Sequence, residues 1–268
     1  MGAPLLITLE GYAIEGGFDV PGGIATCYAP TTALGRHPAA GAADGLWGRY
    51  EEVLALVGAL GVAGVRLTVE WARVEPRAGE VDEVALARYV EIVAAARARG
   101  LRVTVALVDA VWPSWLGMEA WLLPWVAPRV VDHARLIART ITDPEVRFVT
   151  FTQRDSLVRR GFLDGSAPPW RRGARRDAAA AAAQLARLEE ELRRDRDVGP
   201  RTVATFRTVE VNAPLADIAR SRRADVSELY LRSLVRGHGP TRAAAGLLAV
   251  VDGGWRVNAP DDLLAALV

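Results

Sequence analysis

Charged side chains follow short apolar runs along this chain, each near the residue where a run ends. These residues are Glu10, Glu70, Asp109, Arg154, Asp155, Glu210 and Asp252. In parallel α/β folds the carboxyl ends of the strands form the rim of the active site, so the pattern predicts a shared polar rim. Several carboxylates around an arginine suit acid–base catalysis, or a hard cation such as Mg²⁺. For any single residue, the alternative is that a strand simply ends where polar sequence begins.

The elements that must position these residues alternate between strand-length apolar runs and longer segments with helical periodicity. Strands are predicted over residues 5–9, 62–69, 101–108, 147–152, 202–209 and 246–251. Helices are predicted over residues 47–60, 81–99, 132–140, 175–196, 224–235 and 261–267. This alternation favours a parallel sheet with helical crossovers.

The length and the strand count together predict the fold. The chain has 268 residues, and a complete (β/α)8 barrel takes about 250 residues. Only five or six strands can be counted in the sequence, because long loops take up much of the length. We therefore expect an α/β fold that is TIM-barrel-like but shortened or incomplete, in one domain over residues 1–268. A doubly wound open sheet is the alternative, although no G-x-G-x-x-G sequence follows any strand.

Scarce residue types exclude several kinds of chemistry. All 33 basic residues are arginine, so Schiff-base, pyridoxal-phosphate and P-loop mechanisms, which need a lysine amine, are excluded. Cys27 is the one cysteine, which excludes intrachain disulfides and cysteine-rich zinc sites. The histidines, His37, His133 and His238, are too far apart for a helical zinc motif. We expect no cofactor and no bound metal.

The charge balance and the hydropathy pattern indicate partners and location. The net charge is +1, so no basic excess points to nucleic acid or to an anionic membrane. No apolar stretch approaches the roughly 18 residues of a membrane helix. The start of the sequence lacks the basic residues of a secretory signal. We expect a cytoplasmic protein that acts on a small-molecule substrate. Abundant Ala and Arg without Lys are typical of GC-rich coding, as in actinobacteria.

Several segments carry motifs of one enzyme family. GVRLTVEWARVEP at residues 64–76 resembles the second strand and following loop of glycoside hydrolase family 1, the β-glucosidases, which read roughly Y-R-F-S-I-S-W-S-R-I-x-P. The matching positions are Arg66, Trp71, Arg73 and Pro76. Residues 11–17, 99–116, 146–155 and 227–240 resemble further family segments in the same order, so the resemblance covers about residues 4–240. It implies a (β/α) barrel that hydrolyses β-glycosides by double displacement between two carboxylates.

Both catalytic positions of the family are changed in this sequence. The acid/base Glu of the family's Asn-Glu-Pro motif corresponds to Arg154, and arginine cannot donate a proton at neutral pH. The family's nucleophile lies in a Glu-Asn-Gly motif, which is absent because Asn212 and Asn258 each follow a valine. The chain is also expected to end before the strand that would carry this motif.

The residues that hold the sugar in the family are changed as well. In the resemblance, Ala13 replaces the family's sugar-binding Gln, and Asp109 and Ala110 replace its adjoining His and Trp. Gln153 replaces the Asn that precedes the acid/base Glu. The resemblance therefore implies the scaffold of a β-glucosidase without its ordinary activity.

We hypothesise that a glycosidase barrel has been repurposed as a small-molecule enzyme. Acid–base chemistry without a covalent intermediate fits best, as in an isomerase, lyase, cyclase or atypical hydrolase of a biosynthetic pathway. The candidate catalytic residues are Glu70, Asp109, Arg154, Asp155 and Glu210. The candidate substrate-binding residues are Tyr12, Arg66, Gln153, Trp112 and Trp115. Asp109 and Glu210 are the candidates for general acid or base, because burial among like charges raises a carboxyl pKa.

Simpler interpretations stay open for several of these residues. Arg66 can pair with Glu70 or Glu210 as a structural contact, and Trp112 and Trp115 can pack within their own loop. A non-catalytic pseudo-glycosidase that binds a glycoside or a partner protein is the alternative function. A divalent metal held by the carboxylates is a third. The exposed sheet edges of an incomplete barrel would be covered in a homodimer.

Overall fold

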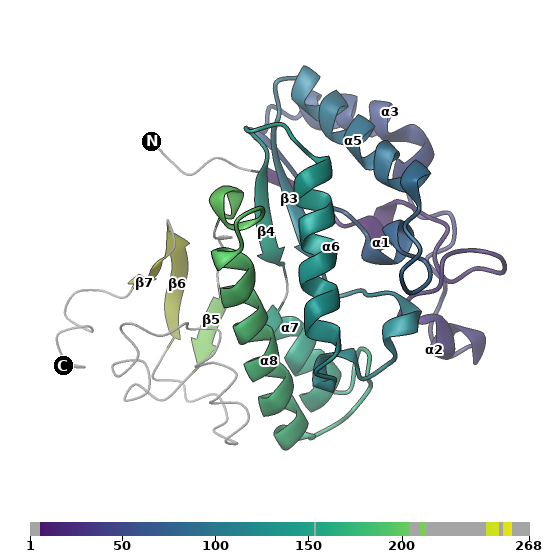
Figure 1. Cartoon of the computed structure of the whole chain (residues 1–268), viewed down its shortest axis with the longest axis vertical. Helices are drawn as coiled ribbons and strands as arrows, with labels where there is room; N and C mark the ends of the chain where they lie inside the picture. The colour runs from purple at the N-terminus through teal and green to yellow at the C-terminus, as the bar shows by residue number, and fades with distance from the viewer. Residues whose placement is uncertain (1–5, 153, 204–208, 213–244, 252–253, 259–268) are drawn as a thin grey trace. The chain divides into compact units, whose positions relative to one another are not determined.

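A computed structural model describes residues 6–152, 154–203, 209–212, 245–251 and 254–258 of the chain. These residues belong to two compact units, each with a sheet of its own (Figure 1). The first unit comprises residues 1–152 and 188–202, and the second comprises residues 153–187 and 203–268. The expectation of one domain over residues 1–268 stays a prediction.

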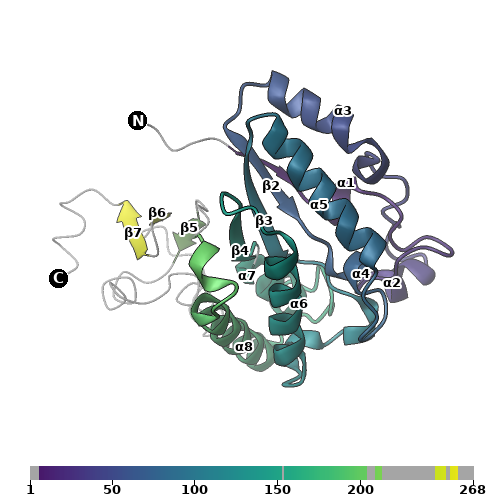
Figure 2. The same ribbon diagram turned by 45° about the horizontal axis from the view of Figure 1, so that its top comes forward.

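The first unit is built on a parallel sheet of four strands in the order β1-β2-β3-β4. The strands are β1 (Leu6–Leu9), β2 (Gly64–Thr68), β3 (Arg102–Val108) and β4 (Arg147–Phe151). Three long helices alternate with them: α3 (Leu46–Ala59), α5 (Glu83–Ala98) and α6 (Val126–Thr140). These helices lie on one side of the sheet (Figure 2). The predicted alternation of parallel strands and helices is confirmed for this unit.

Short helical turns occupy the loops at the carboxyl ends of the strands. They are α1 (Gly11–Ile14), α2 (Ala29–Ala33), α4 (Trp71–Val74), η1 (Ser114–Leu116) and η2 (Ala120–Leu122). The helix α1 follows β1, α4 follows β2, and the 3₁₀ turns η1 and η2 follow β3. One helical turn is too short to show apolar periodicity, so these elements were not predicted from the sequence.

The core of this unit lies between the sheet and the long helices. Val65, Val103 and Phe148 alternate along their strands with less buried residues and are at most 1% exposed. Leu54 of α3 and Ile137 of α6 are equally buried. A side-chain period of two on the strands and 3.6 on the helices places these apolar residues against one another.

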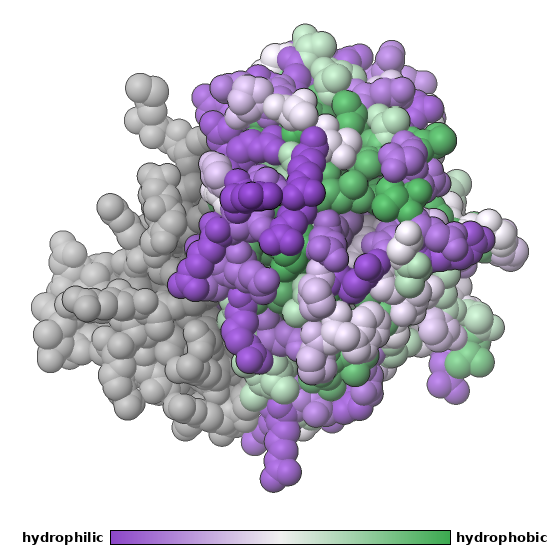
Figure 3. Space-filling view, in the orientation of Figure 1, coloured by the Kyte–Doolittle hydropathy of each residue, from purple (hydrophilic) through white to green (hydrophobic). Residues whose placement is uncertain are grey.

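One face of the described residues is mainly polar. On the face seen in Figure 1, hydrophilic residues predominate, with smaller apolar areas between them (Figure 3). Exposed apolar side chains include Leu56 of α3 and Val84 of α5. Scattered apolar residues are normal on protein surfaces, so the outward faces of these helices are typical of helices that contact water.

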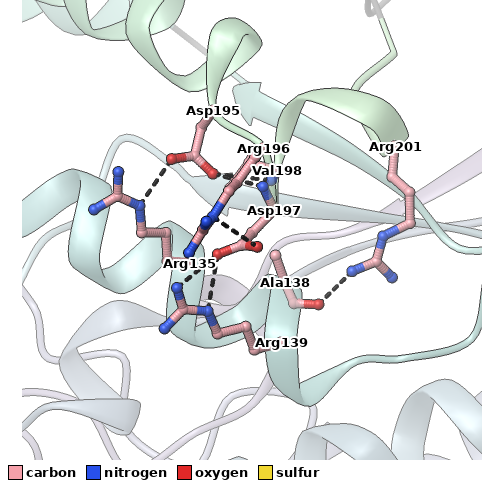
Figure 4. A network of polar contacts seen from close by, with 8 residues as sticks. All are labelled: Arg135, Ala138, Arg139, Asp195, Arg196, Asp197, Val198 and Arg201. Carbon is pink, nitrogen blue, oxygen red and sulfur yellow. Dashed lines mark hydrogen bonds and ion pairs between the residues drawn. The ribbon is translucent and has the colours of Figure 1, made fainter.

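The segment after α8 (Arg175–Arg194) is joined to α6 by ion pairs (Figure 4). The Nε of Arg135 donates to Asp195 over 2.8 Å, and the Nε of Arg139 donates to Asp197 over 2.8 Å. Because Arg135 and Arg139 are one helical turn apart, both guanidinium groups meet carboxylates on the same short segment.

Arg201 completes this junction from the 3₁₀ turn η4 (Gly199–Arg201). Its guanidinium donates to the carbonyl oxygen of Ala138 near the end of α6 (Figure 4). It also donates to the carbonyl oxygen of Ile141, the residue that follows α6. The last carbonyls of a helix have no partner inside the helix, so this arginine satisfies acceptors that would otherwise be unpaired. The next residue, Thr202, forms a parallel bridge with Phe148 of β4.

The second unit contains α7 (Arg154–Val158), the π-helical turn η3 (Arg159–Leu163) and residues 175–187 of α8. Its sheet is antiparallel, in the order β5-β6-β7. The strands are β5 (Val209–Asn212), β6 (Ala245–Val251) and β7 (Gly254–Asn258). None of the helices in the described part of the chain has the length and apolar character needed to cross a bilayer.

This sheet corrects one prediction. The strand predicted over residues 246–251 is present as β6, but it pairs antiparallel with β5 and β7, so its assignment to a parallel sheet was wrong. The sequence Asp252-Gly253 between β6 and β7 is typical of a two-residue hairpin, which joins antiparallel neighbours.

Other predictions fall partly or wholly outside the described residues. Of the strand predicted over residues 202–209, Thr202 forms its parallel bridge in the first unit and Val209 begins the antiparallel β5. The helices predicted over residues 224–235 and 261–267 lie outside the described residues.

His133 of α6 is a buried polar group in the core of the first unit. It is 2% exposed, and its ring is stacked on the indole of Trp71 with a centroid distance of 4.9 Å. Neither ring nitrogen has a hydrogen-bond partner of good geometry within the described part of the chain, although a backbone contact with Leu107 favours the charged form of the ring. Burial lowers the pKa of His133 from 6.5 to about 3, because the apolar surroundings disfavour the imidazolium form.

Stability should therefore fall as the pH falls below 6.5, the ordinary pKa of the imidazole. In that range the unfolded chain binds a proton at His133 while the folded chain does not, which costs about 2 kcal/mol at about pH 5. We expect urea unfolding of His133→Leu to show a smaller loss of stability between about pH 7 and about pH 5 than the wild type. An equal loss in both proteins would contradict this interpretation.

Candidate active site at the strand ends

The candidate site lies where β1, β2 and β3 of the first unit end. Glu70 follows β2 after one residue, and Asp109 directly follows β3. The helix α1, which carries Tyr12, begins two residues after β1. Because the three strands are parallel and adjacent, their carboxyl ends meet at one edge of the sheet.

Glu70 is a carboxyl group almost completely withdrawn from water. It is 1% exposed, and its Oε1 accepts a hydrogen bond from the backbone N–H of Tyr12 over 2.8 Å. Burial and the neighbouring carboxylates of Glu15 and Asp109 raise the pKa of Glu70 well above its ordinary value of 4.5. The carboxyl group is therefore poised to hold a proton that an exposed glutamate would have lost.

A glycine in α1 permits this arrangement. A Cβ atom at Gly11 would lie 2.3 Å from Cγ of Glu70, which is closer than non-bonded carbon atoms can approach. Glycine is therefore required here because the backbone of α1 lies directly against the Glu70 side chain.

Asp109 is held by donors from three strand ends. Its Oδ2 accepts a hydrogen bond from Oγ1 of Thr68 over 3.2 Å, and its Oδ1 accepts one from the backbone N–H of Ala110 over 2.7 Å. The hydroxyl of Thr152, directly after β4, also donates to Oδ1. Asp109 is 8% exposed, so these donors take the place of water around its side-chain oxygens.

A second buried charge cluster lies beside Glu70 and was not predicted as part of the site. Nε of Arg73 donates to Oε2 of Glu15 over 2.7 Å, and the hydroxyl of Tyr89 donates to the same carboxylate over 2.9 Å. The Tyr89 oxygen also accepts the backbone N–H of Glu70 over 3.1 Å. Glu15 and Arg73 both lie in segments that carry the family resemblance, and that was the available signal.

Electrostatics in this cluster favour a structural ion pair. Burial raises the pKa of Glu15, and the adjacent Arg73 guanidinium opposes that rise. Arg73 lies over the rings of Phe18 and Trp47, at 4.5 and 4.1 Å from their centroids. A guanidinium that is both paired and stacked is fixed in place, so Arg73 is suited to hold the loops rather than to move with a substrate.

Tyr12 has its hydroxyl bound to a carboxylate of the same loop. The hydroxyl donates to Oδ2 of Asp19 over 3.0 Å, and Thr26 donates to Asp19 through both its N–H and its hydroxyl. Burial and the negative charge of Asp19 raise the pKa of Tyr12. The backbone of Tyr12, rather than its phenol, therefore contacts Glu70.

Arg66 of β2 has a buried Nε with no hydrogen-bond partner within the described part of the chain. Its possible pairing with Glu70 is not among the contacts of the described residues, where Glu70 accepts from Tyr12 instead. The other residue suggested as its partner, Glu210, has a side chain outside the described part of the structure.

The tryptophans after β3 pack within the protein. Trp112 is 1% exposed, and its indole N–H donates to the carbonyl of Gly117 over 2.9 Å. The indole N–H of Trp115 donates to the carbonyl of Glu75 over 2.8 Å, and its ring meets Trp71 edge to face. Both polar groups are occupied within the chain, which fits the packing role left open from the sequence.

The remaining predicted site residues belong to the second unit. Arg154 is the first residue of α7 and is 7% exposed, and Asp155 follows it on the same helix. Glu210 lies on β5, opposite Leu247 of β6. Gln153 lies outside the described residues, as do the side chains of Asp155 and Glu210.

The first unit thus holds six of the predicted site residues at or near the ends of its strands. They are Tyr12, Arg66, Glu70, Asp109, Trp112 and Trp115.

The acidic residues do not form a metal site within the described ranges. There, no group of three or more His, Cys, Asp or Glu side chains is arranged to hold a metal ion. The buried carboxylates accept hydrogen bonds from protein donors instead.

Comparison with known proteins identifies relatives among glycosidases. Beta-glucosidase 21 of Oryza sativa subsp. japonica is 27% identical over 167 residues, which cover 59% of this chain and 32% of the rice protein. Beta-glucosidase 40 of Arabidopsis thaliana is 23% identical over 128 residues, covering 46% of this chain and 25% of that protein. The match thus spans about a third or less of these relatives.

Solved structures show the fold to which the parallel sheet belongs. An aphid myrosinase superposes with a TM-score of 0.66 at 15% identity, covering 76% of this chain and 47% of the myrosinase. A beta-glycosidase from Pyrococcus horikoshii superposes with a TM-score of 0.62 at 20% identity, covering 74% of this chain and 45% of that enzyme. These matches confirm the expected TIM-barrel-like fold, incomplete relative to a full barrel. They do not support the alternative, an open doubly wound sheet.

The family assignment rests on a family model that matches most of the chain. The family model Glycosyl hydrolase family 1 matches residues 9–210, which include β2 to β4 and the strand ends that carry Glu70 and Asp109. The sequence resemblance is therefore confirmed, and the chain belongs to glycosyl hydrolase family 1.

Proposed function

We propose that this family 1 chain is a small-molecule enzyme that uses acid–base chemistry at the strand ends instead of glycosidic double displacement. The observation that carries the proposal is the pair of buried carboxyl groups at the ends of the adjacent strands β2 and β3. Glu70 is 1% exposed and Asp109 is 8% exposed, and the charge of Asp109 raises the pKa of Glu70.

Their different environments suit different roles. Asp109 accepts three hydrogen bonds, from Thr68, Thr152 and Ala110, and so is suited to act as an ionised base. Glu70 accepts a backbone hydrogen bond and carries a raised pKa, so it is suited to hold and donate a proton. Two carboxyl groups held in such different surroundings can serve as a general acid and a general base.

Arg154 supports the departure from glycoside hydrolysis. It occupies the position of the family's acid/base glutamate in the resemblance, and a guanidinium does not donate a proton at neutral pH. Its proposed role is to bind or orient a substrate through charge-assisted hydrogen bonds. Asp155 and Glu210 are further candidates for acid–base roles, and Gln153 is a further candidate for binding. A biosynthetic setting and a cytoplasmic location stay predictions.

A non-catalytic pseudo-glycosidase is the second candidate function. Two observations favour it. The Asp109 carboxylate already accepts hydrogen bonds from three protein donors, and Trp112 is only 1% exposed, so it has little surface that a ligand could contact. Under this alternative the strand ends would bind a glycoside or a partner protein without turning over a substrate. The experiment that separates the two candidates must therefore detect chemistry rather than binding.

Deuterium exchange is such an experiment, and it does not require the substrate to be identified first. We expect the full chain, incubated in D₂O with small-molecule extract from an actinobacterium, to consume at least one metabolite or to introduce deuterium into it, as followed by mass spectrometry. Asp109→Asn should lower this rate by about 10²- to 10⁴-fold, because the variant keeps the side-chain shape but removes the base.

The matched control is Asp44→Asn, which alters an exposed aspartate in the loop before α3. It should react at the wild-type rate. A wild-type chain that changes no metabolite, or an Asp109→Asn variant as active as the wild type, would favour the pseudo-glycosidase instead.

The proton on Glu70 can be measured directly. In infrared spectra, the difference between the wild type and Glu70→Gln should show a protonated carboxyl group at pH values well above 4.5, the ordinary pKa of glutamate. In an Asp109→Asn background the same signal should disappear at a lower pH, because one of the charges that raises the Glu70 pKa is gone. A Glu70 that loses its proton near pH 4.5 in both backgrounds would contradict the assignment of the acid.

A further inference from the structure

We propose that Arg66 binds the carboxylate of the substrate, so that the substrate class is a small carboxylic acid. This inference rests on the proposed function for the reaction, but the binding step can be tested without it. It starts from the buried Nε of Arg66, which has no hydrogen-bond partner within the described ranges.

Strand periodicity places Arg66 on the face of the sheet that carries the candidate site. Arg66 lies between the core residues Val65 and Leu67, which are 0% and 5% exposed. Thr68 is two residues further along β2 and therefore shares the face of Arg66. Since the Thr68 hydroxyl donates to Asp109, Arg66 lies on the face that is continuous with the Asp109 carboxylate.

The register of the sheet surrounds Arg66 with neutral hydroxyl groups. Thr8 of β1 and Thr104 of β3 are its direct neighbours in the parallel pairing. Paired residues in adjacent strands project to the same face, so both direct neighbours of Arg66 in this row offer neutral hydroxyls. Arg147 is the next residue in the row, and its guanidinium donates to the carbonyl of Pro144.

The donor set fits a monoanion. A buried guanidinium N–H without an acceptor is unfavourable, and an oxygen of a bound ligand would supply the missing acceptor. The Nε edge of arginine matches the two oxygens of a carboxylate in a bidentate pair. Because the Arg147 guanidinium is engaged by the carbonyl of Pro144, Arg66 supplies the unpaired cationic donor of this row. It balances a single negative charge, whereas a phosphate dianion would leave a charge uncompensated near Asp109.

The spacing connects this binding group to the proposed acid and base. Arg66 and Thr68 are two positions apart on β2, which corresponds to about 7 Å along the strand. A small carboxylic acid bound to Arg66 would therefore extend along this face towards the Asp109 carboxylate, which Thr68 contacts. In a 2-oxo or 3-oxo acid, Asp109 would accept the proton of an acidic C–H group while Glu70 donates its proton to the carbonyl oxygen. The product is the enol. Asp109 has gained one proton and Glu70 has lost one, so the number of protons on the enzyme is unchanged.

Isothermal titration calorimetry of the full chain with sodium pyruvate and sodium acetoacetate tests the site, with inorganic phosphate as the competing anion and ionic strength held constant by sodium chloride. We expect a carboxylate to bind more tightly than phosphate. Arg66→Met should weaken carboxylate binding by about tenfold or more, because it removes a charge-assisted bidentate contact.

Two further variants keep the result interpretable. Arg147→Met removes a guanidinium from the same row but not the unpaired donor, and it should bind like the wild type. Thr104→Val preserves shape while removing one hydroxyl, and it should weaken binding by a few-fold even if Arg66→Met fails to fold.

Three results would overturn the Arg66 site. The first is a wild type that binds no carboxylate, and the second is a wild type that binds phosphate at least as tightly as a carboxylate. The third is that the Arg66→Met and Thr104→Val variants both bind carboxylate as tightly as the wild type. Turnover is scored separately by deuterium exchange. Carboxylate binding without exchange would support the Arg66 site and contradict the proposed enzyme. Exchange of a metabolite without carboxylate binding would support the proposed enzyme and contradict the Arg66 site.

Discussion

Three carboxyl groups are buried within one small region where parallel strands end, and the arrangement of the first unit depends on compensating them. Glu15, Glu70 and Asp109 are 3%, 1% and 8% exposed. Withdrawing a charge from water costs several kcal/mol unless donors or a counter-charge replace the water. Arg73, 58 residues from Glu15 in the sequence, forms an ion pair with its carboxylate, and the hydroxyl of Tyr89, 74 residues away, donates a hydrogen bond to it. These contacts hold α1, α4 and α5 together at the strand ends. Burial and two carboxylate neighbours raise the pKa of Glu70, and the backbone N–H of Tyr12 opposes that rise.

The same scaffold can carry a different reaction because its framework and its chemistry reside in different residues. The family resemblance is strong at Trp71 and Arg73, which lie on α4. The departures lie at Asp109, which directly follows a strand, and at Arg154, which begins a helix after one. Function resides in sites built on a fold rather than in the fold itself, so family membership leaves the reaction open.

The sequence by itself determined the repeating strand and helix units of the first unit and the charged residues at the strand ends. It could do so because apolar periodicity and the polarity change at a strand end are local properties of the chain. The family resemblance extended this to the barrel fold. It did not determine the short helices α1 and α4, which are single turns without periodicity, or the antiparallel pairing of β6, since a buried apolar run is compatible with either direction.

Only the tertiary structure decided which partner each charged residue takes. From the sequence, Arg66 had Glu70 as a possible partner, yet Glu70 accepts from the backbone of Tyr12, and Nε of Arg66 has no partner among the described residues. Asp109 was one of several acidic residues at strand ends, and its three donors come from three different strand ends. Hydrogen bonds and charge coupling act over a few ångströms in space, whereas a sequence pattern records only separation along the chain, so the protonation and role of each carboxyl group follow from the fold.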